Sequence, residues 1–207
     1  MFNKIKHFTR QSWLLIVASF CFGLLIAVTN SALSPRIEKN QADKLSNLMR
    51  QLISDAENFD KAAETVQITT GKGKVIETDI YRAFDKNKKN IGFAFIASGA
   101  GFADKIKLVI AVDKNCEKFF GFEVLSSNET PGFGDRIKED YFRNQFKQAP
   151  AEELELVKTG RPETIDNRIV AISGATVSSE AVVKIFNTYI NRIKEQIQTK
   201  GLSGNDQ

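Results

Sequence analysis

The chain has 207 residues, of which 42% are hydrophobic and 26% charged, a balance typical of globular proteins and not of disordered ones. This length accommodates one ordinary domain and a short appendage. The net charge of +4 is mild, and the basic residues are interspersed with acidic ones, so we expect no nucleic-acid partner. Two cysteines and one histidine are too few for a zinc or iron–sulfur site, so any redox chemistry needs an organic cofactor or a partner.

Residues 13–33 form a run without a charged side chain. A helix rises about 1.5 Å per residue, so the run reaches roughly 30 Å, which is enough to cross a bilayer. Polar residues near its end, such as Asn30, shorten the strictly apolar part, and a cleaved signal peptide is therefore the alternative. No small-x-small cleavage pattern follows, so we expect a retained transmembrane anchor.

Three basic residues, Lys4, Lys6 and Arg10, precede this run without an acidic residue among them. Positive residues beside a first span favour the cytoplasmic side. We therefore expect residues 1–12 to be cytoplasmic. The rest of the chain should then lie on the periplasmic or extracytoplasmic side of a cytoplasmic (inner) membrane that it crosses once.

A helical connector is expected over residues 34–60. Pro35 should end the first helix, because proline lacks the N–H that a helix interior needs. A second helix is predicted from Arg36 to about Asp55. Its apolar positions recur at helical spacing and give one stripe, formed by Leu45, Leu48, Met49, Leu52 and Ile53.

The remaining residues, 61–200, predict an α+β domain with an antiparallel sheet and flanking helices, followed by a flexible tail at 201–207. Short β-rich runs separated by turn residues favour antiparallel pairing over crossover helices. A polar helix is expected near 136–148, and a final amphipathic helix over 178–199 with Val182, Ile185, Phe186, Tyr189, Ile193 and Ile197 on one face. The expected strands are 65–70, 75–84, 91–98, 106–112, 119–125 and a short one at 169–172.

The first glycine-containing motif follows the fifth of these runs. It reads Glu129, Thr130, Pro131, Gly132, Phe133, Gly134. A Pro-Gly pair suits a turn with positive φ at its second centre, and a surface turn is the plain interpretation. A large apolar residue between two glycines is poorly suited to a solvated turn, which makes a ligand-binding loop the alternative.

The second motif lies between the short strand at 169–172 and the final helix. It reads Ser173, Gly174, Ala175, Thr176. Small residues at a strand-to-helix junction leave backbone amides uncovered, and the start of a helix carries positive partial charge, so a phosphate group is a suitable ligand. The motif is neither a P-loop nor a dinucleotide fingerprint. The alternative is simple helix capping by Ser178 or Ser179.

Together the two motifs, about 45 residues apart and preceded by a single span, resemble the FMN-binding domain of the Rnf complex G subunit and its relative, the Nqr C subunit. Gly101-Phe102 before a strand adds to the likeness, and the length favours the Rnf relative. There are two departures from the family pattern. Val170 stands where an acidic residue is common, and Asn128 stands where some members have a histidine.

The resemblance implies that flavin mononucleotide (FMN) is joined through its phosphate to the hydroxyl of Thr176 by a dedicated flavin transferase. It further implies that residues 173–175 flank the attachment point. The loop from Glu129 to Gly134, including Thr130, Pro131, Gly132 and Phe133, is implied to lie along the flavin ring.

The function implied by the resemblance is an electron relay in a membrane complex that moves electrons between ferredoxin and NAD, coupled to ion transport. Its partners would be the other membrane subunits of that complex. We expect no independent substrate and no catalytic or metal-ligating residue. The alternatives are an Nqr-type relay, a stand-alone flavin relay, or a non-redox anchored module for binding or assembly.

Overall fold

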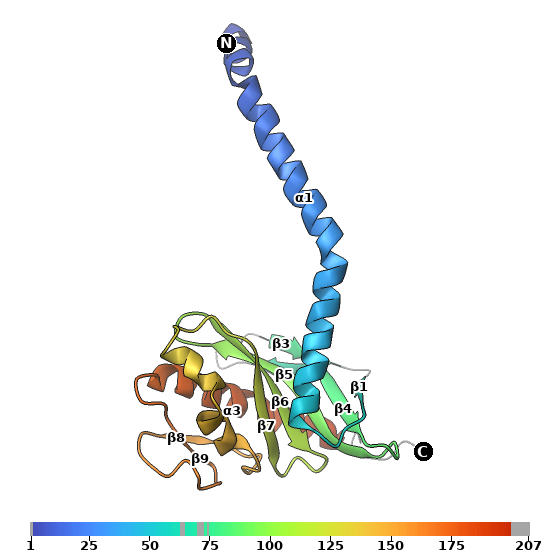
Figure 1. The fold of residues 1–207 in the computed structure, drawn as a ribbon, viewed down its shortest axis with the longest axis vertical. Helices are drawn as coiled ribbons and strands as arrows, with labels where there is room; N and C mark the ends of the chain where they lie inside the picture. The colour runs from blue at the N-terminus through green and yellow to red at the C-terminus, as the bar shows by residue number, and fades with distance from the viewer. Residues whose placement is uncertain (1, 63–64, 70–72, 74, 200–207) are drawn as a thin grey trace. The chain divides into compact units, whose positions relative to one another are not determined.

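The computed structural model describes residues 2–62, 65–69, 73 and 75–199, with side chains from residue 12 onward except that of Thr69. The chain divides into two compact units, residues 1–44 and 45–207, and each is described by itself. The expected tail, 201–207, lies outside the described residues. Figure 1 shows the order of the helices and strands.

The first unit consists of helix α1, which runs from Phe2 to Leu52 and ends in the second unit. The prediction that Pro35 ends this helix was wrong, because the helix continues through it. One proline removes one backbone donor, and the uninterrupted helical turns on both sides outweigh that loss. Within Ser12–Leu52, an 18-residue window has a mean hydropathy of 2.3, and none of that window is buried. Such a helix fits a single-pass membrane protein, since lipid can cover its apolar surface.

The second unit is built on a five-stranded antiparallel sheet in the order β1-β4-β5-β6-β7. The predicted antiparallel α+β fold is confirmed. The longest central pair, β5 and β6, is joined by a short turn at 101–104 that adjoins the site described below. The strands of the sheet are β1 (Asn58–Lys61), β4 (Ile80–Phe84), β5 (Asn90–Ala100), β6 (Lys105–Asp113) and β7 (Phe119–Ser126).

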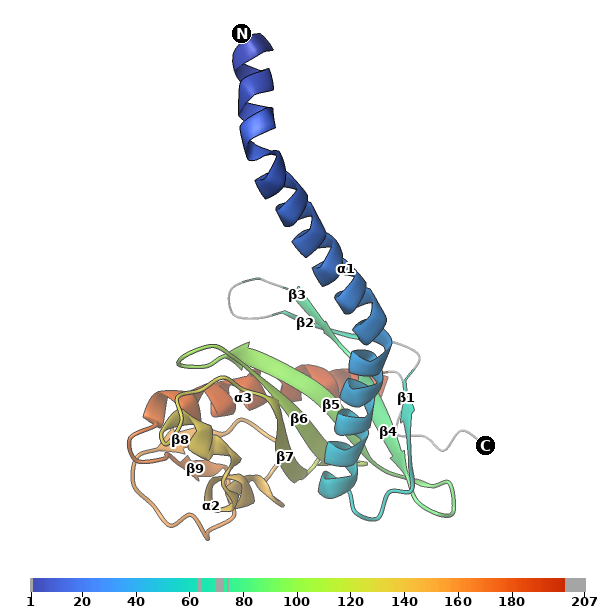
Figure 2. The ribbon, with the colours of Figure 1, turned by 45° about the horizontal axis from the view of Figure 1, so that its top comes forward.

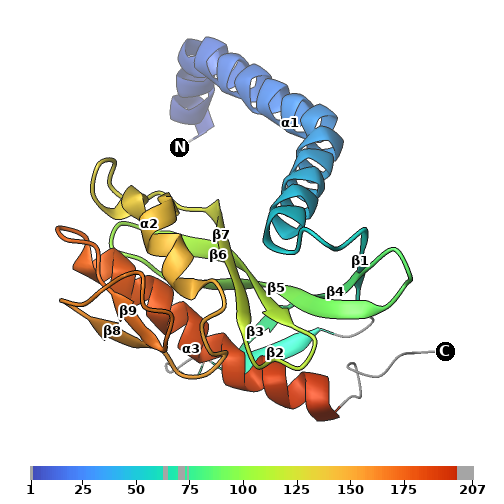
Figure 3. The same ribbon diagram turned by 60° about the horizontal axis from the view of Figure 1, so that its bottom comes forward.

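The two faces of the sheet are covered by different helices (Figures 2 and 3). On one face, α3 (Thr176–Thr199) packs against alternate strand residues such as Phe93, Phe95 and Leu108. On the other face, the last turns of α1 place Met49 against Ala94 and Val109. The alternation follows from the pleat of a strand, which sends successive side chains to opposite faces. Both predicted apolar stripes are confirmed, since each lies in one of these two layers.

Smaller elements complete the second unit. The hairpin of β2 (Val66–Thr69) and β3 (Val75–Thr78) is separate from the main sheet, so the expected strand 75–84 is in fact two. A parallel pair, β8 (Glu155–Val157) and β9 (Arg168–Val170), precedes α3. The polar helix expected near 136–148 was wrong as a single element. It is replaced by η1 (Gly134–Lys138), α2 (Asp140–Arg143) and η2 (Asn144–Phe146).

The expected helix is divided into these three short helices because its apolar residues face the core at several angles. Phe142 and Phe146 both pack edge-on against Phe122 in an aromatic cluster beneath the sheet. The segment 34–60, expected to be a helical connector, contains the end of α1 and most of β1. Sequence patterns did not indicate β1, because Asn58–Lys61 is a mostly exposed edge strand without apolar alternation.

Both cysteines, Cys21 and Cys116, are free thiols. Cys116 is buried, although its surroundings in the sequence are polar. Burial is the main reason that the pKa of its thiol is raised to about 12, and the nearby Asp113 carboxylate adds to this. The Cys116 thiol therefore stays protonated, and Cys116 serves as a packing residue in the core.

Candidate functional site

The start of α3 is organised by short-range hydrogen bonds. The N–H of Ala175 donates to the carbonyl of Ile172 (2.9 Å), and the N–H of Ser179 donates to the carbonyl of Ala175 (3.0 Å). Gly174, which lies between Ile172 and Ala175, has φ of +82°, a left-handed conformation that glycine adopts without strain. Ala175 is thus the last residue before the helix, and Thr176 is its first residue. The helix begins two residues earlier than the sequence pattern predicts.

The expected capping serines are used elsewhere. The Ser179 hydroxyl accepts a hydrogen bond from the N–H of Ile172 (3.0 Å) and donates to the carbonyl of Ala175 (3.0 Å). The Ser178 hydroxyl donates to the Glu129 carboxylate. In the part of the chain that the structure describes, no side chain bonds to the N–H groups of Thr176, Val177 or Ser178. The start of α3 therefore offers backbone donors that lack a helical acceptor.

Glu129 joins three segments of the chain. It is buried, with 5% of its surface exposed. Its Oε1 accepts a hydrogen bond from the N–H of Ala103 (3.1 Å) in the turn after β5, and its Oε2 accepts the hydroxyl of Ser178 in α3. The turn, the motif loop and the start of α3 are therefore connected through one carboxylate.

The two motif loops also meet directly. A methyl group built on Gly134 would lie 2.6 Å from Glu129 Oε2 and 2.6 Å from Ser178 Oγ, so only glycine fits there. A methyl group built on Gly174 would lie 3.7 Å from Cδ1 of Phe133, in ordinary contact. The structure thus brings both loops to one place, as the resemblance implies.

An exposed apolar rim surrounds this junction. Phe133 is 59% exposed, Phe102 is 67% exposed and Val177 is 52% exposed. Large apolar side chains at such exposure on three neighbouring segments form a surface suited to a planar apolar ligand. By contrast, the phenylalanines of the aromatic cluster and of the sheet face under α3, such as Phe93, Phe95 and Phe122, are buried in the core.

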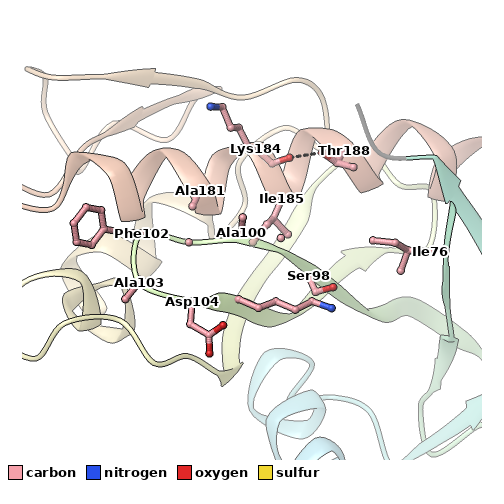
Figure 4. Close-up of a pocket in the computed structure, with 13 residues that line it drawn as sticks. Ile76, Ser98, Ala100, Phe102, Ala103, Asp104, Ala181, Lys184, Ile185 and Thr188 are labelled. Carbon is pink, nitrogen blue, oxygen red and sulfur yellow. Dashed lines mark hydrogen bonds between the residues drawn. The ribbon is translucent and has the colours of Figure 1, made fainter. Parts of the chain in front are cut away.

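A groove of about 830 Å³ continues from this rim along α3 (Figure 4). The turn after β5 forms one wall, with Phe102 beside α3, and Ala181 and Ile185 form the facing wall. Lys184 lies at its edge and pairs with Glu180 (2.7 Å). The groove is continuous with the junction through Gly101 and Ala103, both close to Glu129.

The remaining predicted site residues lie on the outside of the junction. Thr130, Pro131 and Gly132 are exposed, and the Thr130 carbonyl accepts the N–H of Phe133 (3.2 Å) in the turn. Ser173 is exposed, and its carbonyl accepts a hydrogen bond from Arg136 Nη1 (3.4 Å).

The contacts of several residues at the junction were not predicted from the sequence. Ala103, Arg136 and Ser178 act through contacts with distant segments, whereas Ser179 bonds to residues nearby in the chain. Motif spacing contains no signal for such contacts, except that Ser178 and Ser179 follow the second motif directly.

The two departures from the family pattern have structural settings. The Asn128 side chain donates to the Asp104 carboxylate (2.9 Å), so it ties the first motif to the turn after β5. The pKa of Asp104 is lowered by the Lys105 backbone N–H and, to a smaller extent, by Asn128. Val170 lies in β9, where its backbone N–H (2.7 Å) and carbonyl (3.2 Å) pair with the side-chain amide of Gln145.

Comparison with known proteins agrees with this geometry. Residues 101–191 match the FMN-binding domain family. The G subunit of the proton-translocating ferredoxin:NAD(+) oxidoreductase complex of Clostridium ljungdahlii is 34% identical over 182 residues, which cover 88% of each chain. The chain belongs to this family of G subunits. The G subunit of the ion-translocating oxidoreductase complex of Methanosarcina acetivorans is 25% identical over 191 residues, covering 92% of this chain and 97% of the relative.

Two solved structures share the fold. NqrC of Shewanella oneidensis superposes with a TM-score of 0.56 at 21% identity, covering 70% of this chain and 73% of its own. The C subunit of the Na(+)-translocating NADH-quinone reductase of Parabacteroides distasonis gives 0.53 at 20% identity, covering 77% and 95%. At these identities the likeness shows that this chain shares their fold.

The site residues fit the cofactor named by the family. Uncapped N–H groups at the start of α3 suit the phosphate of FMN, since they combine free donors with the positive end of the helix dipole. The exposed rings of Phe102 and Phe133 suit the planar flavin ring. The Thr176 hydroxyl has no hydrogen-bond partner among the described residues, and it lies at the first position of the helix.

Proposed function

We propose that this chain is the electron-relay G subunit of a membrane ion-translocating ferredoxin:NAD oxidoreductase complex, with FMN joined to Thr176 by a phosphoester. The observation that carries the proposal is the position of Thr176. It is the first residue of a helix whose leading N–H groups are uncapped, beside the loop that presents Phe133. A bound flavin supplies one- and two-electron redox chemistry, and its surroundings tune the potential.

Attachment requires that Thr176 be reachable by a second protein. Ser173, Gly174 and Val177 around it are exposed, and Gly174 presents no side chain that could block access. The Thr176 hydroxyl oxygen attacks the flavin-side phosphorus of a flavin dinucleotide held by the flavin transferase and forms the new Oγ1–P bond. The phosphoanhydride bond of the dinucleotide breaks, and the other nucleotide monophosphate leaves and takes up the hydroxyl proton. The N–H groups of the first helical turn then hold the remaining phosphate charge.

The relay works at a membrane, through α1. Lys4, Lys6 and Arg10 precede the span, which supports a cytoplasmic N-terminus and a flavin domain on the periplasmic or extracytoplasmic side. Covalent attachment suits that location, because a flavin lost there is not replaced. The partners are the other membrane subunits of the complex, and the flavin transferase during maturation.

Co-expression with a flavin transferase tests the proposal. The intact mass of the full chain should rise by one FMN less one water, and the band should fluoresce in a denaturing gel. The Thr176→Ala variant should lose both signals completely, because no other hydroxyl lies at the first position of α3. Ser173→Ala is the matched control, since it removes an exposed hydroxyl three residues away and should keep the flavin.

An unmodified wild-type chain under these conditions would contradict the covalent proposal. Fluorescence that persists in Thr176→Ala would place the attachment elsewhere. A non-redox assembly module, the alternative from another class, predicts no flavin in either variant.

A further inference from the structure

Glu129 differs from every other acidic or basic side chain that the structure describes, because it is the only one that is buried. Burying a charged group is unfavourable unless it is paired or hydrogen-bonded. The salt bridges of the described residues do not include Glu129, so its compensation comes from other groups.

The hydrogen bonds of Glu129 are those of an ionised carboxylate. Each oxygen accepts from a donor, Oε1 from the N–H of Ala103 and Oε2 from the hydroxyl of Ser178. Ser178 is the third residue of α3, so the carboxylate also lies at the positive end of the helix dipole. These three contributions together offset the burial of the negative charge.

The backbone around Glu129 is shaped to admit its side chain. A methyl group on Gly101 would collide with Oε1, and one on Gly134 would lie 2.6 Å from Oε2 and 3.0 Å from the Cβ of Glu129. Two glycines are thus required by one carboxylate. A glutamine has the same shape and similar hydrogen-bonding capacity without the charge, so geometry alone does not require a glutamate.

The charge lies next to the flavin attachment point. Ser178, which donates to Oε2, is two residues after Thr176 on the same helix, and Gly134 follows Phe133 of the rim. Water is excluded from the buried carboxylate, so its field is screened less than that of a surface group.

We propose that Glu129 is a positioning residue that joins the two motif loops and whose negative charge lowers the reduction potential of the flavin beside them. This inference rests on the proposed function, since the group acted on is the FMN at Thr176. Reduction adds negative charge next to an existing one, so the carboxylate disfavours the reduced state. Removing the charge makes reduction easier.

The test is a redox titration of the full chain in detergent, loaded with flavin by co-expression with the transferase. Glu129→Gln should shift the midpoint potential to more positive values while the flavin stays attached. Glu163→Gln is the matched control, because it removes one negative charge from an exposed loop and should leave the potential unchanged. A midpoint for Glu129→Gln equal to that of Glu163→Gln overturns the inference.

Ser178→Ala separates charge from positioning, because it removes a hydrogen bond to Oε2 and keeps the carboxylate. Its potential should not rise. A rise above the wild-type potential would assign the shift to the lost contact and would overturn the charge effect. This readout compares Ser178→Ala with the wild type, so it remains usable if Glu129→Gln does not load. Absence of flavin from the wild-type chain is a different result, which counts against the proposed function itself.

Discussion

The two loops that meet at the flavin site are held in different ways. The loop from Glu129 to Gly134 is anchored by a carboxylate whose partners lie 26 and 49 residues away in the chain. The loop from Ser173 to Thr176 is anchored by Ser179 and by backbone bonds that span seven residues or fewer. Long-range anchoring makes the first loop dependent on the whole fold. Local anchoring makes the second loop a property of the helix start.

This difference suits the work that we propose for each loop. A loop that is held locally keeps its shape while its outer side remains open to a transferase, and Ser173 and Gly174 are exposed as that requires. A loop that lies along the flavin ring must stay in register with the start of α3, and the Glu129 carboxylate provides that connection.

The largest effect on the first loop is expected from Gly134→Ala. The added methyl group would lie 2.6 Å from both Glu129 Oε2 and Ser178 Oγ, so it pushes these two atoms apart and disrupts their long-range hydrogen bond. Overpacking of this kind lowers the free energy of unfolding by about 1–3 kcal/mol, and displacement of the loop should also reduce flavin attachment. Chemical denaturation of the full chain in detergent and in-gel flavin fluorescence measure the two effects.

Gly132→Ala is the control for this variant. Gly132 has φ of +78° but open space around its Cβ position, so the change strains the backbone without disturbing Glu129. It should keep its flavin. Equal loss of flavin in the two variants would show that the carboxylate contact does not hold the first loop.

A smaller effect is expected from Ser179→Ala in the second loop. The change leaves the N–H of the buried Ile172 without its acceptor, which lowers the free energy of unfolding by about 1–3 kcal/mol, less a few tenths regained because alanine favours helices. Thr188→Ala on the same helix removes a similar hydroxyl-to-carbonyl bond at a more exposed position (2.7 Å) and should change stability by less than about 0.5 kcal/mol. Denaturation midpoints that coincide for the two variants would contradict the local anchor.

The same distinction explains what could be predicted from the sequence. Features that follow from nearby residues were predicted. They are the antiparallel strands, the apolar face of α3 and the position of Thr176 between a strand and a helix. The helix start was misplaced by two residues because Ser178 and Ser179 resemble capping residues, although their hydroxyls bond to other groups. Local periodicity contains no information on such pairings.

The long-range contacts themselves could not be predicted. The Glu129–Ser178 bond joins residues 49 apart, and the bond to Ala103 depends on a turn that only the paired β5 and β6 strands bring close. The break in the expected helix at 136–148 has the same origin, because Phe142 and Phe146 turn toward an aromatic cluster built by β7 and α3. Family resemblance identified the motifs without showing what supports them.

The smallest effect is expected for the hydrogen bond between Arg136, two residues after the first motif, and Ser173 of the second motif. Arg136 Nη1 donates to the carbonyl of Ser173 at 3.4 Å, and the same guanidinium lies over Tyr141 and pairs with Glu139 (3.7 Å). Because the group is partly exposed, Arg136→Ala should change the free energy of unfolding by less than about 0.5 kcal/mol. Hydrogen exchange at the Ala175 amide, which bonds to Ile172 (2.9 Å), should be unchanged, since local contacts hold it. Faster exchange there in Arg136→Ala would mean that the second loop also depends on long-range support, and the contrast between the loops would then be wrong.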